Sequence, residues 1–122
     1  MARDYTGLVV WQLAADLRIE TLKLTRAPAL ARDFPLRGEM EETVSSICRN
    51  IPEGFRRGTN REFAKFLEYS YGSSGELKSL FEDAQLKKLL TAADLGPARA
   101  LRFRLDRALL GLMRHLRRNK RP

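Results

Sequence analysis

The chain has 122 residues, a single cysteine and an ordinary apolar fraction, which is typical of one globular domain and not of a disordered or disulfide-linked protein. No stretch approaches the ~20 consecutive apolar residues that a membrane-spanning helix needs, and no apolar run of the secretory type follows the N-terminus. These features favour a cytoplasmic protein with no membrane partner.

The net charge of +8 is concentrated towards the C-terminus. Residues 1–58 contain nine basic and eight acidic side chains, and residues 59–93 contain five of each. Residues 94–122 contain nine basic and two acidic side chains, so that this segment alone has a net charge of +7. A charge distribution of this kind suggests a polyanionic partner.

Apolar residues recur with the helical period in four segments, and no segment of useful length alternates as a strand does. The first predicted helix spans residues 8–24, and Pro28 and Pro35 predict a loop after it. The second spans residues 36–51, and Pro52 and Gly54 predict a break or kink at its end. Its inward residues are Met40, Val44, Ile47 and Ile51.

The third predicted helix spans residues 60–90 and begins at a capping box formed by Thr59 and Glu62. Its middle lacks bulk and contains Gly72 and Gly75, which predicts close approach of a neighbouring helix there. The fourth spans residues 97–117, with Pro97 at its first position, and a basic tail covers residues 117–122. Short connections favour antiparallel neighbours, so the predicted fold is all-α: one domain over residues 1–122, an antiparallel up-down four-helix bundle.

Three ordered blocks of residues resemble a known family. They are Leu8-Val9-Val10-Trp11-Gln12-Leu13-Ala14, then Ser46-Ile47 with Asn50-Ile51 and Glu53-Gly54, then Phe63, Phe66-Leu67, Gly72-Ser73 and Glu76-Leu77. In order and spacing they resemble the four-helix bundle proteins encoded in intervening sequences of bacterial large-subunit ribosomal RNA genes. That family is related to the accessory proteins of diversity-generating retroelements.

The resemblance implies a ring-forming homo-oligomer, a pentamer in known examples, and its retroelement branch implies a reverse transcriptase partner. One departure concerns charge, because Glu41 and Glu42 stand where family members usually carry two basic residues. We interpret this acidic pair as a possible contact to basic residues of an adjacent subunit. Pro52 also replaces the usual alanine, and Gly75 replaces a larger residue.

Polar residues within the three blocks invite a catalytic interpretation. We favour a structural role, in which Asn50 and Glu53 cap the kinked end of the second helix and Glu76 accepts from backbone N–H groups near Pro52. No nucleophile–base pair accompanies them, so we expect no enzyme and no cofactor. His115 has no Glu three residues before it, which argues against a di-iron site and leaves no predicted metal ligand.

The remaining motif residues, Trp11, Gly54, Gly72 and Ser73, are also predicted to be structural. Trp11 with Tyr69 and Tyr71 could instead offer stacking surfaces for bases, but aromatic residues at helical spacing more often serve packing. Cys48 has no partner in sequence and is predicted to be a buried or half-buried thiol.

Basic residues of the last predicted helix are the candidate binding site. Few acids interrupt them, and arginine, whose planar fork matches phosphate, predominates over lysine. The predicted nucleic-acid-binding residues are Arg104, Arg107, Arg114, Arg117, Arg118, Lys120 and Arg121. The sequence therefore predicts a non-enzymatic oligomer that binds RNA or DNA through its phosphates. The alternative is a scaffold for protein interactions with a solvated basic face.

Overall fold

A computed structural model describes residues 4–119, and within this range every regular element is a helix. The all-α prediction is therefore confirmed. The number of helices differs from the prediction, since five α-helices and one 3-10 helix are present in the described range. They are η1 (Tyr5–Gly7), α1 (Val9–Thr25), α2 (Pro28–Arg32), α3 (Phe34–Phe55), α4 (Asn60–Leu86) and α5 (Ala92–Arg118).

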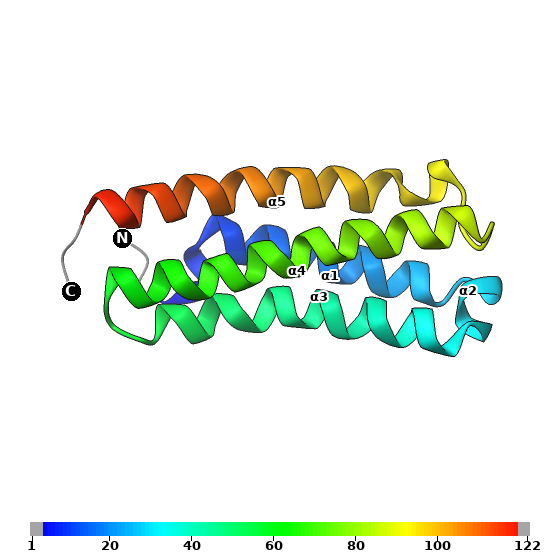
Figure 1. The fold of residues 1–122 in the computed structure, drawn as a ribbon, viewed down its shortest axis with the longest axis horizontal. Helices are drawn as coiled ribbons and strands as arrows, with labels where there is room; N and C mark the ends of the chain where they lie inside the picture. The colour runs from blue at the N-terminus through cyan, green and yellow to red at the C-terminus, as the bar shows by residue number, and fades with distance from the viewer. Residues whose placement is uncertain (1–3, 120–122) are drawn as a thin grey trace.

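Four long helices lie alongside one another, and each runs in the opposite direction to the long helix before it (Figure 1). α1 packs against α3 and α5, and α4 packs against the same two helices, so α1 and α4 face each other across the core. The short helix α2 lies at one end, where it connects α1 to α3 (Figure 1). The outer side of α5 is left uncovered by this arrangement.

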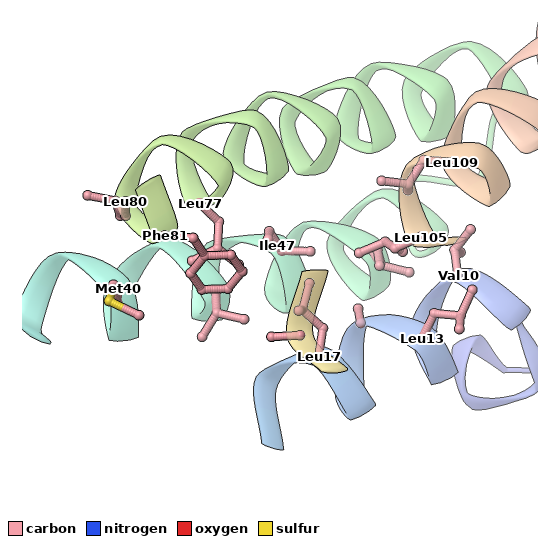
Figure 2. Packing of buried hydrophobic residues seen from close by; sticks show 14 of the residues in the cluster. Val10, Leu13, Leu17, Met40, Ile47, Leu77, Leu80, Phe81, Leu105 and Leu109 are labelled. Carbon is pink, nitrogen blue, oxygen red and sulfur yellow. The ribbon is translucent and has the colours of Figure 1, made fainter. Parts of the chain in front are cut away.

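The core consists of apolar side chains that all four long helices direct inwards (Figure 2). Met40, Val44, Ile47 and Ile51 of α3 are completely buried, as their spacing predicts. α4 contributes Leu67, Leu77 and Phe81, and α5 contributes Leu105 and Leu109. Removal of such side chains from water is the main favourable contribution to folding.

Proline positions account for most of the errors in the predicted boundaries. The predicted loop around Pro28 and Pro35 instead holds α2 and the start of α3, because each proline occupies the first turn of a helix, where its missing N–H is no loss. The predicted break at Pro52 and Gly54 is also wrong, since α3 continues to Phe55. Burial of Ile51 and Gly54 against the core compensates for the hydrogen bond that Pro52 cannot donate.

One boundary of α4 agrees with the prediction, whereas the end of α4 and the start of α5 differ from it. Thr59 caps α4 as predicted, accepting a hydrogen bond from the Glu62 backbone N–H at 3.1 Å, but the described residues show no reciprocal bond from the Thr59 N–H to the Glu62 carboxylate. α4 ends at Leu86 and not near residue 90, and Lys88 follows in a left-handed conformation with φ of 60°. α5 begins at Ala92, five residues before the predicted start, so that Pro97 lies inside it.

A close approach between helices does occur, but at a different glycine from those predicted. A Cβ atom added at Gly54 would lie 2.5 Å from the Phe66 Cβ and 3.1 Å from a ring carbon of Phe63. A Cβ added at Gly72 or Gly75 would meet no other atom within 4 Å, since both glycines are exposed. Gly54, which the sequence suggested as a helix breaker, therefore sets the distance between α3 and α4.

We expect Gly54→Ala to lower the free energy of unfolding by about 2 kcal/mol, because the new methyl group overlaps the rigid Phe66 Cβ and forces α3 away from α4. Gly75→Ala is the matched control, and its better helix propensity should raise the free energy of unfolding by about 0.5–1 kcal/mol. Urea denaturation followed by circular dichroism measures both. Equal effects of the two substitutions would contradict this account of the α3–α4 contact.

Candidate nucleic-acid interface

The start of α5 is fixed by a reciprocal capping box. The Asp94 backbone N–H donates to the Thr91 hydroxyl at 3.0 Å, and the Thr91 backbone N–H donates to the Asp94 carboxylate at 2.9 Å. These bonds satisfy helix-terminal N–H groups, and the bond from the Thr91 backbone is the main reason why the pKa of Asp94 is lowered. From this cap the helix continues for 27 residues to Arg118.

Four arginines of α5 form what we call the basic face: Arg104, Arg107, Arg114 and Arg118. All four are exposed, and they lie on the side of α5 opposite to buried Leu105, Leu109 and Leu116. None of the ion pairs found between residues 4 and 119 includes any of them. The basic face therefore presents guanidinium groups to solvent and is suited to phosphate contacts. The predicted residues Lys120 and Arg121 lie outside the described residues.

Arg117, also predicted to bind nucleic acid, lies away from the basic face and forms an exposed ion pair with Glu68 of α4. Another arginine of α5, Arg102, is turned inwards, which its position in the sequence did not predict. Arg102 donates to the Asp106 carboxylate at 2.7 Å and to the Ser74 hydroxyl of α4 at 3.3 Å. Its side chain is only 12% exposed. Arg102 therefore belongs to the contact between α4 and α5 and not to the outer surface.

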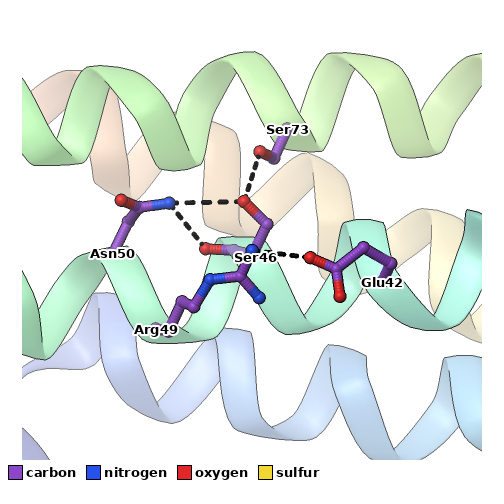
Figure 3. Close-up of polar contacts among 5 residues, drawn as sticks. All are labelled: Glu42, Ser46, Arg49, Asn50 and Ser73. Atoms are coloured by element: carbon purple, nitrogen blue, oxygen red, sulfur yellow. Dashed lines mark hydrogen bonds and ion pairs between the residues drawn. The ribbon is translucent and has the colours of Figure 1, made fainter.

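Three polar residues of the second and third blocks, Ser46, Asn50 and Ser73, lie at the contact between α3 and α4 (Figure 3). The Asn50 amide donates to the Ser46 carbonyl oxygen at 2.8 Å and to the Ser46 hydroxyl at 3.3 Å, and that hydroxyl lies 3.0 Å from the Ser73 hydroxyl. Nearby, the Ser70 hydroxyl donates to the Ile47 carbonyl oxygen at 2.8 Å. These hydrogen bonds join two helices and contain no pair of groups arranged for nucleophilic attack.

The structure does not contain the contacts that we predicted for Asn50, Glu53 and Glu76. Asn50 and Glu53 do not cap a kinked helix end, because α3 continues past both of them. Glu53 is exposed and pairs with Arg57 at 2.8 Å. Glu76 is also exposed, and within residues 4–119 no hydrogen bond connects it to the backbone near Pro52. The continuity of α3 explains this, since it leaves no free N–H groups for Glu76 to satisfy.

A model of the 23S rRNA-intervening sequence protein family matches residues 6–109. The chain belongs to this family. The match covers all three blocks of residues described above and most of α5, and it ends before Arg114. A comparison with curated proteins returns no match.

The acidic pair Glu41 and Glu42, which we predicted to contact an adjacent subunit, lies on α3 of this member of the 23S rRNA-intervening sequence protein family. Glu42 is exposed and forms an ion pair with Arg49 at 2.6 Å (Figure 3). Glu41 is half-buried. Glu42 thus already has a cationic neighbour within the chain, although an exposed pair of this kind contributes little to stability and exchanges partners easily.

Aromatic residues that the sequence grouped together are separated in this family member. Trp11 lies on α1 and packs edge-to-face against Tyr5, with ring centroids 5.6 Å apart. Tyr69 and Tyr71 lie on α4, across the core from α1, and are 48% and 38% exposed. The three rings therefore do not form one stacking surface. A different aromatic ring, that of Phe103 beside the basic face, is more exposed than either tyrosine.

Two negative findings apply to the part of the chain between residues 4 and 119. No group of three His, Cys, Asp or Glu side chains there could hold a metal ion, and His115 is an exposed residue in the last turn of α5. No helix in the same range is long and apolar enough to cross a membrane.

Cys48 lies between α3 and α1, where its thiol donates to the Ala14 carbonyl oxygen at 3.3 Å. Burial raises the pKa of this thiol to about 11, with a small opposing effect from the positive charge of Arg18. At neutral pH the thiolate population is therefore very small, and a nucleophilic role is disfavoured.

We expect stability to fall as the pH rises from about 9 towards 11, because the unfolded chain releases the Cys48 proton in this window and the folded chain retains it. Below the pKa of the Cys48 thiol in the unfolded chain, both states hold the proton, so the contribution of this thiol to stability is fully present there. Urea denaturation at several pH values measures the effect, and Cys48→Ala should show a smaller loss. An alkylation rate of native Cys48 close to that of the unfolded chain at pH 8 would contradict the raised pKa.

Proposed function

We propose that this protein is a non-enzymatic, self-associating four-helix bundle of the cytoplasm that binds the phosphate backbone of RNA or DNA through the basic face of α5. The observation that carries the proposal is the set of exposed arginines, Arg104, Arg107, Arg114 and Arg118, that have no acidic partner within the described residues. Nothing in the packing of α5 requires their charge, since the helix is held by leucines on its other side.

Arginines spread along a helix can bind a nucleic acid without a cavity, because they act by neutralising phosphates. Each guanidinium that contacts a phosphate releases condensed counterions, so affinity arises from the number of contacts and falls steeply with salt. Contacts to phosphate position the protein and do not read sequence. We therefore propose binding with weak sequence preference.

The family to which the chain belongs is described by its origin in 23S rRNA intervening sequences, and this supports a role close to RNA. An accessory role beside an rRNA element or a reverse transcriptase follows from the resemblance described above. Self-association into a pentameric ring rests on the same resemblance. A ring would repeat the basic face around its circumference, and each additional contact would then add to affinity by effective concentration.

We expect the double variant Arg114→Glu/Arg118→Glu to lose retention on a nucleic-acid column, because two phosphate contacts become repulsive. The wild-type protein should bind at low salt and elute as salt increases. The matched control is Arg26→Glu/Arg32→Glu, which changes the net charge equally at exposed positions at the opposite end of the bundle (Figure 1). This control should retain most of the wild-type affinity.

Equal losses in the two double variants would mean that net charge alone, and not the basic face, governs binding. Retention of the wild-type protein that is absent or insensitive to salt would favour the alternative of a scaffold for protein partners.

We further expect Glu41→Lys/Glu42→Lys to reduce the oligomer mass in light scattering, if these acids contact basic residues of an adjacent subunit. The Glu42–Arg49 ion pair within the chain predicts a modest effect from Glu42 alone. Repeating the measurement with a short structured RNA at low and high salt tests whether nucleic acid binds to the oligomer. An unchanged oligomer mass in the double variant would rule out the intersubunit role of the acidic pair.

A further inference from the structure

Phe103 is an exposed aromatic residue in the most basic part of the chain. Its ring is 58% exposed, and the core residues Leu105 and Leu109 lie on another side of the same helix. A single exposed apolar side chain is common on protein surfaces and indicates nothing by itself. The neighbours of Phe103 are what distinguish it.

Four arginines lie within one helical turn of this ring, and one of them, Arg102, is turned inwards to Asp106 and Ser74. Arg99 and Arg107 are four residues before and after Phe103, so they lie on the same side of α5, and Arg104 of the basic face is the next residue. The guanidinium carbon of Arg107 lies 5.9 Å from the centre of the Phe103 ring. Arg99 is directed towards α4, where it donates to the Gln85 side chain at 2.8 Å. Phe103 is therefore an apolar surface bordered by Arg99, Arg104 and Arg107, none of which has an acidic partner in the described residues.

This combination matches the chemistry of an unpaired nucleotide, which has a flat apolar base attached to a charged phosphate. Bases stack on aromatic side chains while arginines neutralise the backbone on either side. A base within a duplex has both faces covered by its neighbours and cannot reach a ring on the convex side of a straight helix. Unpaired bases in loops, bulges and single strands are free to do so.

We propose that Phe103 stacks on an unpaired base of the nucleic acid whose phosphates contact Arg104 and Arg107. The inference rests on the proposed function and refines it, because it identifies single-stranded segments as the preferred ligand. Phosphate contacts alone do not discriminate single strands from duplexes in this way, whereas a stacking residue does.

The chain contains an internal comparison for this site. Phe34 is 67% exposed, and the Arg37 guanidinium carbon lies 5.1 Å from its ring centre. It thus repeats the exposed phenylalanine and the adjacent arginine. Phe34 lies at the start of α3, beside Asp33 and outside the basic face, so the same substitution there tests an exposed phenylalanine with one adjacent arginine away from the basic face.

The experiment measures binding of the full-length protein to three labelled oligonucleotides by fluorescence anisotropy: an unstructured RNA, the DNA of the same sequence, and the RNA in a perfect duplex. We expect Phe103→Ala to weaken binding of the unstructured RNA roughly tenfold, which lies within the range for one base stacked on an aromatic ring. Binding of the duplex should change less than about twofold, and the salt dependence should be unchanged because no charge is removed. Phe103→Trp should retain the single-strand affinity, and Phe34→Ala should have no effect on any ligand.

Unchanged single-strand affinity in Phe103→Ala, with normal binding by the wild-type protein, would overturn this inference and leave the proposed function intact. An equal loss for duplex and single strand would also overturn it. So would a change in oligomer mass that accounts for the loss, since Phe103 would then contact another subunit. A wild-type protein that binds none of the three ligands would overturn both proposals. The RNA and DNA arms show which polymer the wild-type protein prefers, and a loss in Phe103→Ala that is confined to the unpaired strands supports stacking with either polymer.

Discussion

The close contact between α3 and α4 is the constraint on which the rest of the structure depends. Gly54 has no space for a side chain, and hydroxyl groups of Ser70, Ser46 and Ser73 lie between the two helix backbones. Small residues and short hydrogen bonds fix both the distance and the register of this pair. Once the pair is fixed, Ile47 and Leu67 project into the same interior, and α1 and α5 complete the core from the other side.

The same contact explains why the most recognisable residues of the family carry no evident chemistry. The Ser46–Ser73 hydrogen bond joins α3 to α4, Asn50 holds Ser46 in place from within α3, and Gly54 allows the helices to approach. A larger residue at any of these positions would alter the distance between helices and shift every core layer beyond it. Requirements of packing and hydrogen bonding therefore account for these residue types without a catalytic role.

The sequence predicted the core well, because burial in a helical protein follows a periodic pattern. Met40, Val44, Ile47 and Ile51 could be assigned from spacing alone, and all four are buried. Helix boundaries were predicted less well. Proline indicates where a helix is disfavoured locally, but the burial of Ile51 and of Leu95 keeps α3 and α5 helical across Pro52 and Pro97.

Glycine positions show a further limit of sequence-based prediction. Gly54, Gly72 and Gly75 are equivalent in local propensity, and only the arrangement of neighbouring helices distinguishes the one that permits a close approach. The basic face was predictable for the opposite reason, since exposed charge on one helix depends on the sequence of that helix alone. The neutralisation of Arg117 by Glu68 could not be predicted from the helix alone, because 49 residues separate the partners.

The different structural roles of the four long helices follow from these contacts. α3 and α4 carry the small and polar residues that set the geometry. α5 packs on α4 and α1 through its leucines, and Arg102 of α5 also donates to the Ser74 hydroxyl of α4. Because this attachment uses the inner side of α5, the outer side can change its charge without disturbing the fold. Exposed arginines on such a helix can be replaced without loss of core packing, whereas the residues of the α3–α4 contact cannot. A bundle built in this way can therefore keep its architecture while the charge on the outer side of α5 changes.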